Sequence, residues 1–289
     1  MNADFLQAVD ERSASARASG DLLPIQAEET VLEDAGLRFI VRWVSSLAVK
    51  DAAKVTLPGG PRDPDFNPFL APEPALTVGP VGEHHVAILN KFPVCDRHLV
   101  LARRTFEEQL IPLAPIDFAA LARVMGEYGG LGFYNGGAPA GASQRHKHVQ
   151  WIPEAAGNAS LRLLANGLPA TLAEHGLARH PALAMQHCFV RVRNATGTPV
   201  EVAAHSMHAA FGLACRSLAL TPDVSGLLPS FNLLTGDGWL MLVPRSREHF
   251  DEVSINALSY GGTLYVRRPE QVEAIRATGP LRVLAAVGC

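Results

Sequence analysis

Two histidines and a glutamine recur at every second position in the segment His146-Lys147-His148-Val149-Gln150. Side chains alternate between the two faces of an extended strand, so His146, His148 and Gln150 are expected on one face. A neutral imidazole can attack a phosphoryl centre and form a covalent phosphoramidate, which splits one difficult displacement into two easier steps. A neighbouring amide can donate hydrogen bonds to the oxygens as charge develops on them. The spacing therefore indicates a phosphate site with a histidine nucleophile.

The residues before this strand are small and favour the same interpretation. Gly141, Ala142 and Ser143 have little or no side chain, and Gln144 follows them. Backbone N–H groups in such a turn can approach an anion closely. The turn and the strand together predict a cradle for phosphate oxygens next to the imidazoles.

A metal site is the second interpretation of the same pattern, because His-x-His on a strand offers two imidazole ligands. Such a site needs a third ligand, and five other histidines are candidates: His84, His85, His98, His205 and His208. Nothing in the sequence brings one of them to the strand. Both interpretations stay open on the residues alone, with the nucleophile favoured.

Two further segments carry polar residues between apolar runs. Asn90-Lys91-Phe92-Pro93 is either a plain turn or a polar lip over a nucleotide. Lys50 and Lys54 follow a predicted strand and precede a long loop, so they are either surface charges or ligands of a polyphosphate.

A predicted strand ends near residue 243, and two arginines follow it. Arg245 and Arg247 follow Val243-Pro244, and loops at strand ends often carry function. Guanidinium groups suit phosphate oxygens. The alternative is a cluster of surface ion pairs with Glu248 or Asp251.

Helices and strands that must position these residues are mixed along the whole chain. In the first half the patterns predict a helix over 2–19, a strand over 38–48, a loop over about 57–80, strands over 86–89 and 98–102, and a helix over 115–128. In the second half they predict a strand over 189–193, a helix over 203–219, a hairpin of 231–234 with 239–243, and a last helix from Pro269 to Gly279-Pro280. Residues 157–186 fit no single pattern.

The chain is expected to form one domain over 1–289, in which the part to about 153 carries the histidine strand and 189–289 completes the sheet.

Composition excludes several classes of protein. With 289 residues, 48% of them hydrophobic and 18% charged, the chain can bury a sizeable core. The net charge of -3 gives no reason to expect nucleic-acid binding, and no apolar run is long enough to span a bilayer. The four scattered cysteines and the absence of a signal-peptide pattern at the N-terminus favour the cytoplasm.

Taken together, the segments resemble one family, the diadenosine tetraphosphate phosphorylases, also called ATP adenylyltransferases, within the histidine-triad-like superfamily. Four blocks carry the resemblance: 90–94 with 98–101, 141–150, 232–234 with 243–246, and 254–258. The resemblance implies an α+β fold with an antiparallel sheet and packed helices, related to histidine-triad proteins and to galactose-1-phosphate uridylyltransferase.

The resemblance also implies a role for each matching residue. His148 would be the nucleophile that forms an adenylyl-histidine, Gln150 would hydrogen-bond the phosphate oxygens, and His146 would help to order the strand. The substrate-binding positions would be Lys50 or Lys54, Asn90, Lys91, Asn135, Gly141, Ala142, Ser143, Gln144, Asn232 and Arg245.

The implied reaction is reversible: diadenosine tetraphosphate and phosphate give ATP and ADP. A magnesium ion would bind to the polyphosphate, since hard cations prefer oxygen ligands, and no dedicated metal site is expected in the protein. A sugar-1-phosphate nucleotidylyltransferase and a non-catalytic nucleotide-binding sensor are the alternative functions.

Overall fold

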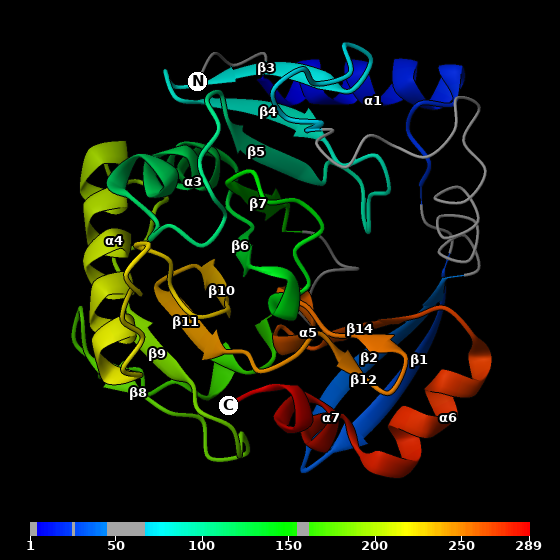
Figure 1. The fold of residues 1–289 in the computed structure, drawn as a ribbon, viewed down its shortest axis with the longest axis vertical. Helices are drawn as coiled ribbons and strands as arrows, with labels where there is room; N and C mark the ends of the chain where they lie inside the picture. Colours follow the sequence, from blue (N-terminus) through cyan, green and yellow to red (C-terminus); the bar gives the residue numbers. More distant parts are fainter. Residues whose placement is uncertain (1–4, 25–26, 45–66, 155–161) are drawn as a thin grey trace.

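The fold is taken from a computed structural model, which describes residues 5–24, 27–44, 67–154 and 162–289. Its centre is a sheet in which nine strands of these residues pair antiparallel throughout (Figure 1). In spatial order they are β3 (Thr77–Val81), β4 (His85–Leu89), β5 (Leu99–Arg103), β7 (His148–Ile152), β6 (Leu131–Gly136), β10 (Phe231–Gly236), β11 (Trp239–Pro244), β9 (Cys188–Arg191) and β8 (Leu177–Ala178). Because β6 pairs with β10, one sheet joins the two halves of the chain.

Helices cover one face of this sheet. Helices α3 (Pro115–Tyr128) and α4 (Val200–Ser217) pack side by side (Figure 1), and α1 (Phe5–Ser19) lies against β3. Phe118 of α3 and Phe211 of α4 share a buried core with Tyr134, Val149 and Trp151 of the sheet. Burial of these large apolar side chains is the main force that holds the helices to the sheet.

A second core lies on the opposite face. Phe133 and Leu234 of the sheet pack there with Leu258 and Leu284. The elements on this side are β1 (Ala27–Asp34), β2 (Leu37–Val44), β14 (Thr263–Val266), α5 (Ala257–Tyr260), α6 (Pro269–Thr278) and α7 (Pro280–Val287). Strands β1, β2 and β14 form a smaller sheet, in which β2 pairs antiparallel with β1 and parallel with β14.

Strand β7 alternates as the sequence predicts. Val149 and Trp151 face the helices, so His148 and Gln150 lie on the other face. His146 precedes the strand and forms an isolated bridge with Glu108. His148 and Gln150 therefore lie on the side of the C-terminal elements, whereas the buried Lys147 lies on the other face, where its Nζ donates to the Pro112 carbonyl (3.1 Å).

Most predicted elements are confirmed, and helix α3 shows why. Pro115 occupies its first turn, the Asp117 carboxylate accepts a hydrogen bond from the Ala114 N–H (2.8 Å), and Gly129 ends it at a φ of 63°. The bounds agree with the predicted helix over 115–128. The predicted strand over 38–48 is described only as far as Val44.

Two predictions were wrong. The loop expected over 57–80 contains strand β3 at its end, because Thr77–Val81 pairs with β4 despite Gly79 and Pro80. The helix from Pro269 is not the last one. Gly279, at a φ of 88°, ends α6, but Pro280 then opens α7, since proline is tolerated in a first helical turn.

The remaining elements of the described residues are short. They are the 3-10 turns η1 (Ala138–Ala140) and η3 (Ala165–Gly167), and the paired strands β12 (His249–Phe250) and β13 (Val253–Ser254).

Candidate active site

The imidazole of His148 has a defined tautomer. Its Nδ1 lies 2.7 Å from the backbone carbonyl of His146. A carbonyl only accepts, so Nδ1 carries the proton and the lone pair is on Nε2. Burial lowers the pKa of His148 to about 4, so the ring is neutral at pH 7. No group in the described part of the chain donates to Nε2, so His148 has the charge state and the electron pair that a nucleophile needs.

An aromatic ring covers this imidazole. The ring centroid of Phe69 lies 4.8 Å from that of His148, which is 5% exposed. Phe69 also packs edge-on against His146 at 5.7 Å. The two histidines therefore lie on the same side of the strand, as predicted, and Phe69 shields both from water.

His146 is fully engaged with the protein. Its Nε2 lies 2.7 Å from the carbonyl of Arg103, and its Nδ1 lies 2.9 Å from Nδ2 of Asn67. Neither ring nitrogen is left for a metal or a substrate, since one donates and the other accepts. Among the described residues, no group of three or more His, Cys, Asp or Glu side chains could hold a metal ion. His146 instead orients His148 through its backbone carbonyl.

Gln109, which the sequence analysis did not single out, holds the backbone of the nucleophile strand. The pairing of β6 with β7 ends where Phe133 faces Gln150. Beyond that point Gln109 Oε1 accepts the N–H of His148 (3.0 Å), and its Nε2 donates to the carbonyls of Asn135 (2.9 Å) and His148 (3.3 Å). A buried amide thus replaces one level of strand pairing and fixes His148 relative to Asn135.

His98 is a second residue that was missed as a site residue; the sequence offered it only as a metal ligand. It directly precedes β5, and its Nε2 is 3.0 Å from Oε1 of Gln150. The backbone N–H of Val94 donates to its Nδ1 (3.4 Å), so Nε2 carries the proton and donates to Gln150. With Oε1 occupied, Gln150 presents its amide N–H groups to the adjoining pocket.

The pocket beside Gln150 has a volume of about 240 Å³. One wall is polar and comes from the segments that the sequence analysis selected: Asn90, Asn135, Gly141, Ser143 and Gln150, with His98. An apolar wall is formed by Phe92, Val94, Phe133, Leu258 and Tyr265, and the C-terminal side adds Glu248, Glu252, Ser254, Asn256, Arg267 and Gln271. Such a combination of apolar surface and a few converging polar groups is typical of a small-molecule site.

The glycine turn lies at this pocket through Gly141 and Ser143. Gly141 has a φ of 86°, and an added Cβ would lie 3.0 Å from Cβ of Asn256, so glycine is required there. Within the described part of the chain, the N–H groups of Ser143 and Gln144 donate to no protein acceptor. Ala142 and Gln144 are part of the turn without lining the pocket. These N–H groups are suited to an anion.

His146 and His148 lie beside the pocket without lining it, and besides Ala142 and Gln144 three more predicted binding residues do not line it. Lys91 Nζ lies 3.0 Å from both carboxylate oxygens of Glu73, in a partly exposed ion pair. Asn232 and Arg245 are buried behind the pocket wall, 0% and 4% exposed. Lys50 and Lys54 lie outside the described residues.

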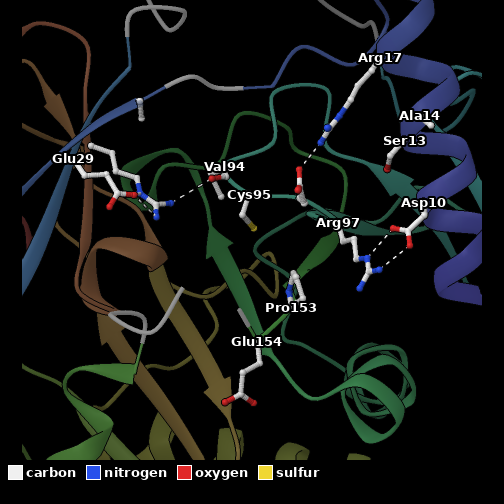
Figure 2. Close-up of a pocket in the computed structure, with 13 residues that line it drawn as sticks. Asp10, Ser13, Ala14, Arg17, Glu29, Val94, Cys95, Arg97, Pro153 and Glu154 are labelled. Atoms are coloured by element: carbon white, nitrogen blue, oxygen red, sulfur yellow. Dashed lines mark hydrogen bonds and ion pairs between the residues drawn. The ribbon is translucent and has the colours of Figure 1, made fainter. Parts of the chain in front are cut away.

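A larger cavity, of about 640 Å³, lies between α1 and the loop at Val94 (Figure 2). Its three arginines are each bonded to a carboxylate: Arg17 to Asp96, Arg42 to Glu29 and Arg97 to Asp10. With its cations neutralised and a fourth carboxylate, Glu154, in its lining, it is a poor site for a polyphosphate. The smaller pocket is the candidate active site.

Known structures share this fold. The chain superposes on yeast Ap4A phosphorylase Apa2 with a TM-score of 0.77 and 24% identity, over 99% of this chain and 94% of that one. It also matches Apa2 solved in complex with Ap4A, with a TM-score of 0.74 and 23% identity, over 99% and 97% of the two chains. The expected α+β fold with a large antiparallel sheet is confirmed.

Sequence comparisons identify the class. Two Saccharomyces cerevisiae proteins are each 27% identical: Protein APA1 over 93% of this chain and 88% of its own length, and diadenosine 5',5'''-P1,P4-tetraphosphate phosphorylase 2 over 92% and 88%. The Ap4A phosphorylase N-terminal domain model matches residues 1–165, and the ATP adenylyltransferase C-terminal domain model matches residues 181–289. The chain belongs to the Ap4A phosphorylase family.

No helix among the described residues is both long and apolar enough to cross a lipid bilayer.

Proposed function

We propose that this chain is a nucleotidyltransferase that catalyses the reversible phosphorolysis of diadenosine tetraphosphate to ATP and ADP. The observation that carries the proposal is the buried, neutral His148 beside Gln150 on the same strand face, with no donor to its Nε2 lone pair among the residues that the structure describes. Membership of the Ap4A phosphorylase family supports the choice of substrate. One sheet that spans both halves supports a single catalytic unit over 1–289.

In the first step Nε2 of His148 attacks the α-phosphorus of one adenylyl group. A P–N bond forms, the P–O bond to the bridging oxygen breaks, and ATP leaves as the anion. The Nδ1 proton stays on the ring, where the carbonyl of His146 stabilises the positive charge of the adduct. The amide of Gln150 and the N–H groups of Ser143 and Gln144 hold the phosphoryl oxygens.

In the second step inorganic phosphate takes the place of the departed ATP. One of its oxygens attacks the adenylyl phosphorus, the P–N bond breaks, and ADP leaves with the lone pair restored to Nε2. Both steps conserve the protonation of Nδ1, so no proton shuttle is needed at His148. Phosphate rather than water as the acceptor distinguishes this reaction from hydrolysis.

A magnesium ion bound to the polyphosphate would supply charge neutralisation. Glu248 and Glu252 line the pocket and offer hard oxygen ligands, which fits an ion held mainly by phosphate oxygens.

All four cysteines are free thiols, which supports a reducing compartment such as the cytoplasm.

The test is a product assay with and without inorganic phosphate. The protein is incubated with diadenosine tetraphosphate and magnesium, and nucleotides are separated by chromatography. Equal amounts of ATP and ADP that appear only with phosphate are expected, and intact-mass measurement after an acid-free quench should detect one AMP added per chain. ATP and AMP formed without phosphate would identify a hydrolase. Exchange of label between a sugar phosphate and its nucleotide sugar would identify the uridylyltransferase type of activity, and binding without an adduct would identify a sensor.

A further inference from the structure

Arg245 uses its whole guanidinium group inside the protein. Its five N–H groups make five hydrogen bonds: Nε to the carbonyl of Val287 (3.1 Å), Nη1 to that of Ile255 (2.9 Å) and to Oδ1 of Asn232, and Nη2 to those of Arg247 (2.7 Å) and Glu248 (3.3 Å). A guanidinium has only five such donors, so none remains for a phosphate. Arg245 can therefore act on the site only through the residues that it holds.

One of these residues is Asn232 on β10. Its Oδ1 accepts from Arg245, while its Nδ2 donates to the carbonyl of Ala140 and to Oδ1 of Asn135, both at 2.9 Å. A guanidinium only donates and a carbonyl only accepts, so the orientation of this fully buried amide is unambiguous. Arg245 at one end and Ala140 at the other hold Asn232 in a single orientation.

The fixed orientation of the Asn232 amide in turn determines the orientation of the Asn135 amide. Strands β6 and β10 pair in a register that places Asn135 directly opposite Asn232. Oδ1 of Asn135 accepts from Asn232 Nδ2 and from the backbone N–H of Ala257, both at 2.9 Å. These two donors hold the side-chain oxygen of Asn135 towards Asn232 and Ala257, so its amide nitrogen points away from them. Asn135 lines the pocket, and its Nδ2 has no acceptor among the described residues.

We infer that Arg245 and Asn232 are positioning residues that force Asn135 to present its amide N–H groups, rather than its oxygen, to the phosphoryl group. This inference rests on the proposed function and replaces the expectation that Arg245 and Asn232 bind substrate directly. An Asn side chain can turn about its last bond at small cost, and turned over it would place a partial negative charge against an anion. The chain Arg245–Asn232–Asn135 removes that second orientation before the substrate arrives. Preorganised donors of this kind cost no reorganisation during the reaction.

A double-mutant cycle tests this relay, by which we mean the chain of hydrogen bonds Arg245–Asn232–Asn135. The readout is the rate of AMP adduct formation in a single turnover. Asn135→Ala removes the donor and should lower this rate on the order of 10²-fold, comparable to the loss of one oxyanion donor. Asn232→Asp keeps an acceptor for Arg245 but cannot donate to Asn135, so it should lower the rate by a similar factor. In the Asn135→Ala background, Asn232→Asp should have little further effect.

Independent effects that multiply in the double variant would overturn the relay and indicate a separate electrostatic role for the buried arginine. Asn194→Asp, an exposed change of the same type, is the matched control and should leave the rate unchanged. Thermal melting checks that each variant is folded.

If Asn232→Asp does not fold, Asn135→Asp gives the second test. It keeps the oxygen that Asn232 and Ala257 bind but replaces the pocket-facing nitrogen with a charged oxygen. The adduct rate should then fall further than in Asn135→Ala; an equal or smaller loss would show that the nitrogen does not face the phosphate. Failure of the wild-type protein to form any AMP adduct would overturn the proposed function itself, whereas an intact wild-type reaction with an additive cycle would overturn only the relay.

Discussion

The Nε2 atom of His98 lies 3.0 Å from Oε1 of Gln150, and this contact determines which end of the Gln150 amide faces the pocket. The two residues are 52 positions apart in the sequence and meet because β5 pairs with β7. A histidine that donates to the amide oxygen leaves the amide nitrogen for an anion.

We expect His98→Ala to lower kcat about 5-fold with a smaller change in substrate affinity. A single neutral hydrogen bond contributes about 1 kcal/mol, and each 1.4 kcal/mol of transition-state stabilisation is about a factor of ten in rate. The same change in a Gln150→Ala background should have little further effect. His84→Ala, at an exposed position, is the control. Equal losses in both backgrounds would contradict the contact's role.

Gln150→Ala should reduce the adenylylation rate on the order of 10²-fold. Gln150→Glu should reduce it further, because His98 would bind one carboxylate oxygen and the other would face the phosphoryl group with a negative charge. Single-turnover kinetics compare the two variants. A Gln150→Glu enzyme as fast as Gln150→Ala would show that this side chain does not contact the phosphate.

His148→Ala should abolish turnover and AMP adduct formation while leaving nucleotide binding largely intact. Loss of a nucleophile affects the transition state far more than the ground state. Titration calorimetry with diadenosine tetraphosphate measures the binding, and mass spectrometry measures the adduct. Retained turnover, or an adduct on another residue, would remove His148 from the role.

The low pKa of His148 also predicts how stability depends on pH. Its pKa falls from 6.5 to about 4 on folding, so the folded state binds fewer protons than the unfolded state below pH 6.5. Stability should therefore decline as the pH is lowered from about 6.5 towards 4, by about 3 kcal/mol from this group, with no further loss below the folded pKa.

Urea unfolding of the wild type and of His148→Gln at several pH values measures the contribution of His148 to the pH dependence of the free energy of unfolding. The pKa of His146 is lowered in the same direction, so both proteins lose stability in acid, and the difference between them isolates His148. Parallel pH profiles would show that this imidazole titrates normally.

Gln109→Glu should destabilise the fold as well as slow the reaction. Its Nε2 donates to two backbone carbonyls in a buried position, and a carboxylate oxygen there would face both carbonyls without a proton to share. Loss of such a buried hydrogen-bond partner costs about 1–3 kcal/mol. Urea unfolding at pH 7.5 checks this against Gln186→Glu, an exposed change expected to lie within about 0.5 kcal/mol of wild type. Equal stabilities for the two variants would contradict the bracing role of Gln109.

The strand face of His148 and Gln150 could be predicted from the sequence because side-chain alternation is a local rule. The partners that tune these residues could not. Gln109 and His98 are 39 and 52 positions away from the groups that they bind, and only the sheet brings them together. Arg245 shows a different limit: its residue type suits phosphate, but type alone does not tell whether the guanidinium meets phosphate or carbonyl oxygens.

The pairing of β6 with β10 has a consequence for how such a chain can be recombined. Asn135 belongs to the half matched by the N-terminal family model, and Asn232 to the half matched by the C-terminal one. A chimera of two relatives would inherit these residues from different parents. Its two halves would be compatible only if both parents kept the same amide pair in the same register across this one seam of the sheet.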